Sequence, residues 1–362
     1  MKNWIPEAER LQCVRNYGHM DQVARVKRYT LDDGKAAGIT ACDVETGGGL
    51  AYTVLPGRGM DIAYASYRGV PIAYLSKAGI TGPGYHDPRD LQWLKSFFAG
   101  LLTTCGVGNA GPPCRESLPI LGDTPFGLHG DISNTGAAHI CTEADWQTDG
   151  RYRLRVAGQV EEGRFHGEHL RLKREIISYL GEKRIYLWDV FENIGDTNQP
   201  LMFFYHFNIG HPILSENSLF LAPSKKVWAE TDVAKLGLSG YEYYSAPEAG
   251  ILEQQFFHDP RADQNGRTVV ALVNKRLELG VYLRFSVEEL PCFAQWKVQR
   301  HGEYVHAFEP GICHPIGREA AQRDGTLMWL APLERREVRL ELGVLDGEEE
   351  IAALSEEVRK AI

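Results

Sequence analysis

Three neighbouring runs of sequence decide the fold: HLRLKREIISYL at 169–180, RIYLWDVFENI at 184–194 and LMFFYHFNI at 201–209. Each run has the length of a strand and is rich in β-branched and aromatic residues, which favour sheets. The segments LGEK and GDTNQP that separate them have the composition of turns. Together with the alternating run YRLRVAGQV at 152–160, they predict consecutive antiparallel hairpins, a β-meander.

Strand patterns continue on both sides of this meander. Residues 47–76 contain three short strand-like runs separated by PGRG and RGVP, and four more runs lie between residues 267 and 345. Regularly spaced short strands without a Pro/Gly/Ser-rich linker predict an all-β fold, a large antiparallel β-sandwich with few short helices. We expect residues 1–362 to form a single domain that ends in a surface helix at 347–362.

One segment fits two kinds of structure. In RDLQWLKSFFAGLLTTCG, residues 89–106, Leu91, Leu94 and Leu101 fit a helical period. The glycine and threonine at its end fit a strand instead. The pattern therefore leaves helix and strand open here.

Composition and charge limit the classes of function. The chain has 362 residues, of which 43 % are hydrophobic and 24 % charged, as in ordinary globular proteins. The formal net charge is -9, and no sustained run of Lys and Arg occurs, so we expect no nucleic-acid partner. An acidic surface is compatible with a small-molecule substrate.

Seven cysteines are scattered without C-x-x-C spacing, which predicts reduced thiols rather than a disulfide framework or zinc knuckle. The opening MKNWIPEAERLQ has no apolar signal region, and no apolar run reaches 18 residues. We therefore expect a cytoplasmic protein with no membrane partner. The sequence does not indicate an oligomeric state.

The strand FFYHFNIGHP, residues 203–212, carries polar groups on one face. Side chains alternate across a strand, so His206 and Asn208 point away from the apolar face of this segment. A histidine in a strand is commonly a hydrogen-bonded core residue. It is also a group whose proton exchanges near neutral pH, and it can serve acid–base chemistry.

Two further segments carry ionisable groups beside glycine or proline. His129 lies in PFGLHGDISN at 125–134, and Glu309 ends the apolar run of YVHAFEPGICHPIG at 304–317. Taken singly, they are also consistent with a turn residue and a solvated strand end. With His206 they predict an acid–base site that needs no metal and no cofactor. The chain has no G-x-x-x-x-G-K phosphate loop and no G-x-S-x-G elbow.

These three segments resemble the aldose 1-epimerase family, the galactose mutarotase-like proteins. FGLHGDISN and FFYHFNIGHP resemble the segments of the family's two histidines, and HAFEPG resembles the segment of its glutamate. The motifs LPGRGMDIA, GLLTTCGVGNAG, YHFNIGHPIL, QWK and FEPG resemble a divergent branch of unassigned function. The resemblance covers roughly residues 20 to 345.

The resemblance implies a sugar substrate and interconversion of its α and β anomers. Glu309 would remove the proton of the C1 hydroxyl, and His206 would protonate the ring oxygen. His129 would hydrogen-bond the sugar near that oxygen. Tyr205 stands where galactose mutarotases carry an asparagine, so the resemblance does not specify the sugar.

Further substrate-binding candidates follow from side-chain chemistry. Arg58 and Lys297 offer donors for hydroxyls or for an anionic sugar substituent, which would permit an acidic sugar. Trp296 could stack on a sugar, although alternation allows either Trp296 or its two neighbours to face the site. The remaining candidates, with less support, are Asn208, Gln295 and Asp131.

Two other functions remain open at this point. A non-catalytic carbohydrate-binding protein could keep the cleft without turnover, although pure binding does not require a matched acid and base. A sugar isomerase or epimerase could act at another carbon, and a metal-dependent, cupin-like form of it could use His206 and His211 with a glutamate and another histidine as ligands. His206 and His211 are five positions apart and fall on opposite faces of a continuous strand, which argues against such a metal site.

Overall fold

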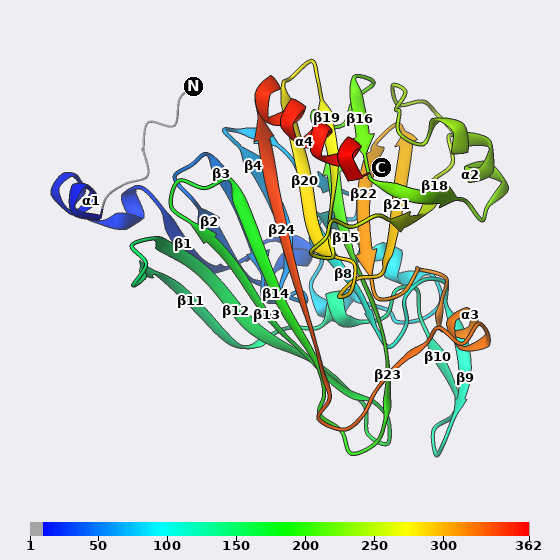
Figure 1. The fold of residues 1–362 in the computed structure, drawn as a ribbon. Coiled ribbons are helices and arrows are strands. Elements are labelled where there is room, and N and C mark those ends of the chain that lie inside the picture. The colour runs from blue at the N-terminus through cyan, green and yellow to red at the C-terminus, as the bar shows by residue number, and fades with distance from the viewer. Residues whose placement is uncertain (1–9, 362) are drawn as a thin grey trace.

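A computed structural model describes residues 10–361 (Figure 1). Two large antiparallel sheets pack face to face with the hydrophobic core between them. The predicted all-β fold, a large antiparallel β-sandwich with few short helices, is confirmed. No helix among the described residues is long and apolar enough to cross a membrane.

The first sheet has 12 strands, and ten of them form one continuous path. Its order is β1 (Arg25–Thr30), β2 (Thr40–Glu45), β3 (Leu50–Leu55), β4 (Asp61–Tyr67), β8 (Leu102–Val107), β15 (Gln199–Gly210), β22 (Glu303–Gly311), β21 (Cys292–Arg300), β18 (Gln254–Pro260) and β17 (Ser224–Trp228). Two short strands pair at its margins, β5 (Val70–Pro71) with β4 and β23 (Met328–Leu330) with β15.

The second sheet has eight strands. Its order is β11 (Ala138–Trp146), β12 (Tyr152–Gly163), β13 (His169–Tyr179), β14 (Arg184–Asn193), β24 (Arg335–Asp346), β20 (Leu279–Ser286), β19 (Arg267–Asn274) and β16 (Ser218–Leu221). The other strands form two separate pairs. In these, β6 (Tyr74–Leu75) pairs with β7 (Ala99–Gly100), and β9 (Cys114–Leu118) pairs with β10 (Gly122–Phe126).

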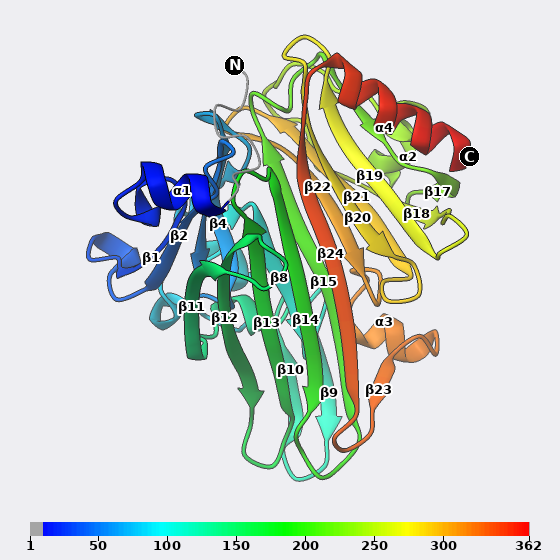
Figure 2. The ribbon, with the colours of Figure 1, turned by 60° about the vertical axis from the view of Figure 1, so that its left-hand side comes forward.

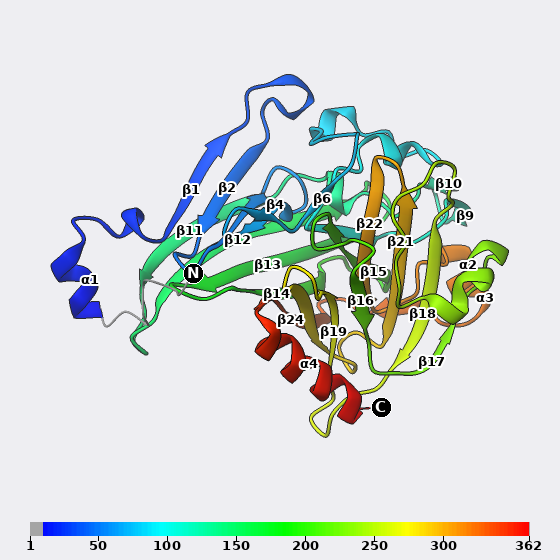
Figure 3. The same ribbon diagram turned by 90° about the horizontal axis from the view of Figure 1, so that it is seen from above.

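The helices are short and peripheral. They are α1 (Arg10–Asn16), α2 (Asp232–Gly237), α3 (Arg318–Arg323) and α4 (Glu348–Ala361). In the segment where a terminal helix is expected, α4 runs along the outer side of the second sheet (Figure 3). Its Ile351, Leu354 and Val358 pack against Val269 and Tyr282 of that sheet, so a helix-period apolar stripe is buried.

The predicted meander is correct for β12, β13 and β14, which pair in sequence order. It is wrong for the last step, because β15 does not pair with β14. Figure 2 shows β14 beside β24 in the second sheet, and β15 lies between β8 and β22 in the first sheet. The far edge of β14 is occupied by β24, so the chain crosses between the sheets at 194–198.

After this crossover, β15 is buried along its whole length. On the core side, Phe203 stacks on Phe191 of β14 at 3.8 Å between ring centroids. The opposite side holds Phe204, His206 and Asn208. We call this side of the first sheet, which faces away from the second sheet, the outer face.

Inside the sandwich, a buried ionic cluster joins the two sheets. Arg174 of β13 contacts Asp189 through Nη2–Oδ2 at 2.6 Å and Asp61 of β4 through Nη1–Oδ1 at 3.2 Å. The hydroxyl of Tyr205 donates to Asp189 at 2.7 Å. Because charged groups in a core need partners, this cluster fixes how β4, β13, β14 and β15 pack.

The ambiguous segment 89–106 contains both kinds of structure. A 3₁₀ turn at Gln92–Lys95 is followed by β7 and β8. The turn carries Trp93, which is buried and stacks on Phe97 at 4.6 Å between ring centroids. These two aromatic side chains reach the outer face of the first sheet beside β15.

Candidate active site

His206 and Glu309 meet on the outer face of the first sheet. The register pairs Phe204 with Gly311 and Phe207 with Phe308, so His206 and Glu309 occupy facing positions of β15 and β22. Nε2 of the imidazole lies 3.2 Å from Oε1 of the carboxyl group. The structure therefore brings together two of the three predicted acid–base residues, although they are distant in sequence.

We call the pair of His206 and Glu309 the dyad. Aromatic side chains cover it. The rings of Phe97 and Trp296 contact the imidazole edge-on, with centroid distances of 5.4 and 5.2 Å. His206 is only 5 % exposed and Glu309 only 3 %. Nε2 of Gln255 donates to Oε2 of Glu309 at 3.0 Å. The dyad is thus almost fully shielded from solvent, and the amide of Gln255 holds the carboxyl group of Glu309.

Burial changes the proton affinity of both dyad groups. It raises the pKa of Glu309 to about 8, against the smaller effect of the Gln255 hydrogen bond. It lowers the pKa of His206 to about 4. At neutral pH the pair therefore holds one exchangeable proton, on the carboxyl group, beside an imidazole that can accept it.

His129 lies in the loop after β10, where its φ is +57°. The loop is tied to the strand end because the backbone N–H of Gly106 donates to the carbonyl of His129 at 2.8 Å. The next residue, Gly130, admits no side chain, since a Cβ there would clash with the carbonyl oxygen of Gly106. Glycine at position 130 is therefore required by this close approach.

The ring of His129 has a defined tautomer. The backbone N–H of Gly111 donates to Nδ1 at 3.2 Å, so the neutral ring carries its proton on Nε2. Burial lowers its pKa to about 3. The ring contacts Phe204 and Trp93 edge-on at 5.2 and 4.9 Å. His129 therefore belongs to the aromatic cluster around the dyad and can act as a neutral donor.

A cavity of about 410 Å³ lies next to the dyad. Its lining includes Tyr74, Leu94, Phe97, Glu253, Trp296 and Arg300. Phe97 and Trp296 belong both to this cavity and to the aromatic cover of His206. Nε1 of Trp296 donates to Glu253 at 3.0 Å, which fixes the indole. Of the three predicted alternatives in QWK, Trp296 is the residue that faces this side.

Arg58, Gln295 and Lys297 are not part of this site. Arg58 is 1 % exposed and donates to the backbone carbonyls of Ser133, Thr81 and Ser96. It braces loops, and its buried, committed donors give the predicted substrate-binding role no support.

Alternation in β21 turns Gln295 and Lys297 to the core side. Lys297 donates there to the carbonyls of Gly240, Tyr241 and Tyr243. Gln295 donates to the carbonyl of Tyr241 at 2.8 Å. These positions give the predicted substrate-binding roles of Gln295 and Lys297 no support, and the argument from charge for an acidic sugar loses the support of both of its residues.

Asn208 and Asp131 lie near the site without reaching the dyad. Asn208 shares the outer face with His206 but is fully buried, and its Nδ2 donates to the carbonyl of His206 at 2.8 Å. Asp131 pairs with Nε2 of His86 at 2.7 Å and lines a different cavity. Asn208 supports the backbone of His206, and neither residue is in position to be a direct ligand of a sugar at the dyad.

Sequence reasoning missed four residues of the site, namely Trp93, Phe97, Glu253 and Gln255. The first two lie in the segment whose pattern was ambiguous. Gln255 belongs to the run QQFF, where the amide that points to the outer face is set by the pairing of β18 with β21. Only the register of this pairing distinguishes Gln255 from Gln254.

The described residues contain no group of three or more His, Cys, Asp or Glu side chains that could hold a metal ion. His211, the second ligand of the metal-dependent alternative, is an exposed residue that follows the end of β15. The positions of His206 and His211 therefore give that alternative no support.

The two packed antiparallel sheets have the galactose mutarotase-like sandwich fold. Residues 36–344 match the family described as "Domain of unknown function (DUF4432)", and the chain belongs to this family. A search of curated proteins finds no match.

Three solved structures are similar to this chain. A candidate aldose 1-epimerase from Klebsiella pneumoniae is 25 % identical, with a TM-score of 0.86, over 94 % of this chain and 90 % of that one. A galactose mutarotase-like protein from Clostridium acetobutylicum is 13 % identical, with a TM-score of 0.60, over 90 % of this chain and 99 % of that one.

Galactose 1-epimerase from Lactobacillus acidophilus is 12 % identical, with a TM-score of 0.60, over 90 % of this chain and all of that one (100 %). At the identities of the latter two structures, the likeness concerns the fold alone. The Klebsiella pneumoniae protein shares nearly the whole length of this chain.

Proposed function

We propose that the protein is a cofactor-independent sugar isomerase of the aldose 1-epimerase type. The observation that carries the proposal is the facing pair of His206 and Glu309, 3.2 Å apart beside a cavity. An acid and a base in contact suit this reaction, because the two oxygens that exchange protons are both bonded to C1 of the sugar. The similarity to the Klebsiella pneumoniae protein supports the same proposed activity.

The reaction needs the dyad proton on His206, whereas burial favours it on Glu309 in the resting site, so a proton transfer within the dyad comes first. Transfer of the Glu309 proton to His206 gives a carboxylate and an imidazolium. The carboxylate takes the proton of the C1 hydroxyl while the imidazolium protonates the ring oxygen, and the bond between C1 and that oxygen breaks. The open-chain aldehyde then rotates about C1–C2, and closure by the reverse steps returns the proton. His129 donates a hydrogen bond from Nε2 near the ring oxygen.

Access to the dyad requires movement of aromatic side chains. Phe97 and Trp296 border the cavity on one side and touch the imidazole on the other. Displacement of either ring would admit a sugar, and its return would exclude water from the reacting atoms. Their apolar surfaces would also cover the C–H face of the bound ring.

The test is anomer exchange, measured by NMR saturation transfer on neutral, acidic and phosphorylated sugars. We expect Glu309→Gln and His206→Asn to lower the enzymatic exchange rate by about 10²–10⁴-fold, the usual contribution of a positioned acid or base. The matched controls Glu349→Gln and His301→Asn change exposed residues outside the site and should leave the rate unaltered.

Sugar binding without acceleration of exchange for any sugar would contradict the proposal. It would favour a carbohydrate-binding protein or chemistry at another carbon. Equal rates in the dyad variants and in the wild type would likewise exclude the assigned roles of Glu309 and His206.

A further inference from the structure

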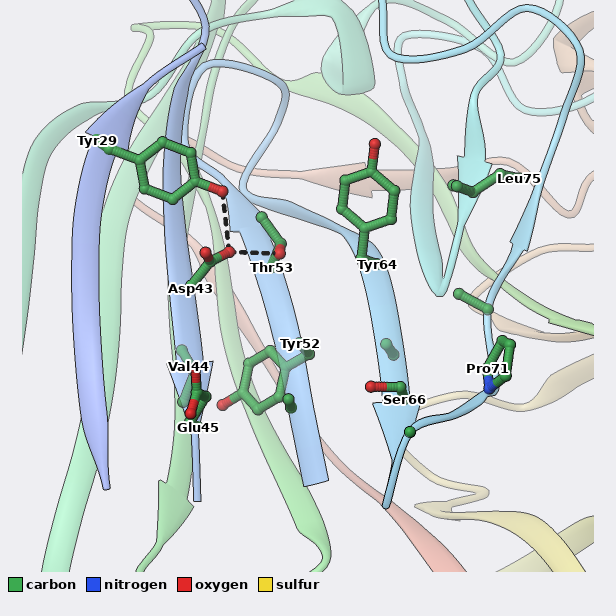
Figure 4. Close-up of a pocket in the computed structure, with 14 residues that line it drawn as sticks. Tyr29, Asp43, Val44, Glu45, Tyr52, Thr53, Tyr64, Ser66, Pro71 and Leu75 are labelled. Atoms are coloured by element: carbon green, nitrogen blue, oxygen red, sulfur yellow. Dashed lines mark hydrogen bonds between the residues drawn. The ribbon is translucent and has the colours of Figure 1, made fainter. Parts of the chain in front are cut away.

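A second cavity, of about 480 Å³, lies on the outer face at the end of the first sheet formed by β1 to β4 (Figure 4). Four successive strands supply polar side chains to its lining. Among them are Tyr29, Asp43, Thr53 and Tyr64, one from each strand. Asp43 and Thr53 are cross-strand partners in the register of β2 and β3, so their positions are fixed by the sheet rather than by a loop.

This cavity is separate from the one beside the dyad. The chain between β5 and β7 forms a common wall, with alternate residues turned to opposite sides. Ala73 and Leu75 line the second cavity, while Tyr74 and Ser76 line the cavity beside the dyad. A ligand in the second cavity would therefore not touch His206 or Glu309.

The floor of the second cavity is a preorganised carboxylate. The hydroxyls of Tyr29 and Thr53 both donate to Oδ1 of Asp43, at 2.9 and 2.6 Å. Oδ2 has no hydrogen-bond partner among the described residues, and no ion pair within residues 10–361 involves Asp43. A fixed carboxylate with one free oxygen is a strong acceptor for ligand hydroxyls.

Aromatic rings flank this carboxylate. Tyr64 is 48 % exposed and Tyr29 is 38 % exposed, both high for aromatic residues in the middle of strands. The register shifts between Tyr52↔Ala65 and Val54↔Ile62, so β4 bulges at the position of Tyr64. Bulges re-aim side chains, and this one turns the Tyr64 ring outward beside Thr53 (Figure 4).

We propose that this second cavity is a binding site for a neutral saccharide, distinct from the dyad. A sugar ring offers an apolar C–H face for Tyr64 and adjacent hydroxyls for Oδ2 of Asp43, with further partners in the Tyr64 and Ser66 hydroxyls. Among the described residues that line the cavity, none is a lysine or arginine, which disfavours phosphorylated or acidic sugars. The hydroxyl-bearing side chains of the lining favour a polyol over a simple amine.

Ligand binding at this second cavity can be measured independently of turnover. Methyl glycosides of glucose, galactose and mannose are suitable probes, because a blocked C1 hydroxyl prevents ring opening. With ¹³C-labelled tyrosine rings, the signals of Tyr29 and Tyr64 are assigned through Tyr29→Phe and Tyr64→Phe. We expect at least one glycoside to shift both signals in a saturable manner. Wild type and a His206→Asn/Glu309→Gln variant should bind it with the same affinity.

Variants at the cavity provide the decisive comparison. Asp43→Asn should weaken binding by about 10-fold or more, since it removes a charge-assisted hydrogen bond. Tyr64→Phe keeps the ring and should change affinity much less than Tyr64→Ala. Asp259→Asn, in an exposed pair on β18, is the matched control.

Three outcomes would overturn the proposal. They are the absence of any tyrosine shift, shifts that survive unchanged in Asp43→Asn, and shifts produced by choline but by no glycoside, which would assign the cavity to a cation. Loss of anomer exchange in the dyad variants is measured separately. Failure of the proposed isomerase and failure of this site are therefore distinguishable.

Discussion

Two buried groups of ionisable side chains, one inside the sandwich and one on its outer face, use their hydrogen-bonding capacity differently. In the core, Arg174 directs its guanidinium to Asp189, Asp61 and the hydroxyl of Thr104. Asp189 receives the Tyr205 hydroxyl as well. Nearly every donor of this cluster is committed to a fixed partner, so the cluster can hold two sheets together but cannot exchange protons with a ligand.

The dyad is equally buried but far less committed. Glu309 has one amide donor, Gln255, and His206 has a buried Nδ1 without a partner among the described residues. The remaining contact is between the two groups themselves, beside a cavity. Burial alone therefore does not distinguish a structural ionic cluster from a site of chemistry. In this chain the dyad differs from the core cluster because it has fewer partners and lies beside a cavity.

The largest effect is expected from breaking the core cluster. Arg174→Met leaves two carboxylates in the core without their cation and should lower the free energy of unfolding by about 3–5 kcal/mol. Urea denaturation followed by far-UV circular dichroism measures this loss. Arg115→Met, in the exposed pair with Asp123, is the control and should cost no more than about 1 kcal/mol. Equal losses would contradict the structural role of Arg174.

Titration of the dyad should instead lower the free energy of unfolding as the pH rises. Below pH 4.5, Glu309 is protonated in both the folded and the unfolded chain. Between pH 4.5 and about 8 the unfolded chain releases this proton and the folded chain keeps it, so the free energy of unfolding falls. The opposite contribution of His206 ends at pH 6.5, the ordinary pKa of histidine.

From pH 6.5 to 8, wild type should therefore lose about 1–2 kcal/mol relative to Glu309→Gln. Urea denaturation of both proteins across this range measures the difference, and the other titrating groups cancel in it. Parallel curves for the two proteins would show that the pKa of Glu309 is not raised in the folded chain.

A smaller effect is expected at the amide that holds the carboxyl group. The Gln255 hydrogen bond lowers the pKa of Glu309. Gln255→Leu should therefore raise that pKa and move the alkaline limb of the pH profile, where the exchange rate falls as Glu309 loses its proton, to higher pH. The pH profile of anomer exchange measures this limb. Gln254→Leu is the control, because Gln254 binds the carbonyl of Val233 instead. A lower rate without a shifted limb would indicate only a packing role for Gln255.

The smallest effect on exchange is expected on the core side of β21. Lys297→Met removes an ammonium whose pKa burial lowers to about 8, and it should leave the exchange rate within about threefold of wild type. Trp296→Ala changes the adjacent residue on the outer face and should reduce the rate clearly more. A greater loss from Lys297→Met would contradict the assignment of faces to β21.

The sequence was sufficient for the fold class and for the residues of the dyad. Strand-length apolar runs and turn compositions identify β12, β13 and β14, and period-2 alternation separates His206 from the core side of β15. What alternation cannot specify is the partner of a strand. The choice between β14 and β22 as neighbours of β15 depends on which edges are already occupied in the folded sheet.

The predicted roles of Arg58 and Lys297 lack structural support for a common physical reason. A basic residue in a loop or strand was interpreted as a donor for substrate, but both side chains satisfy backbone carbonyls of distant loops. Such carbonyls are invisible in a sequence pattern because every residue carries one. The aromatic cover was missed for a different reason, since Phe97 belongs to a segment that mixes a 3₁₀ turn with strands.

The position of His206 in the chain also governs when the dyad comes into existence. Its strand pairs with β8 on one side and β22 on the other, each of these partners lying roughly 100 positions away in sequence. Such high contact order makes these pairings late and slow events. During synthesis, His129 and His206 have left the ribosome long before Glu309 does. A nascent chain therefore carries both histidines without their carboxyl partner, and the acid–base pair appears only after residue 309 has been made.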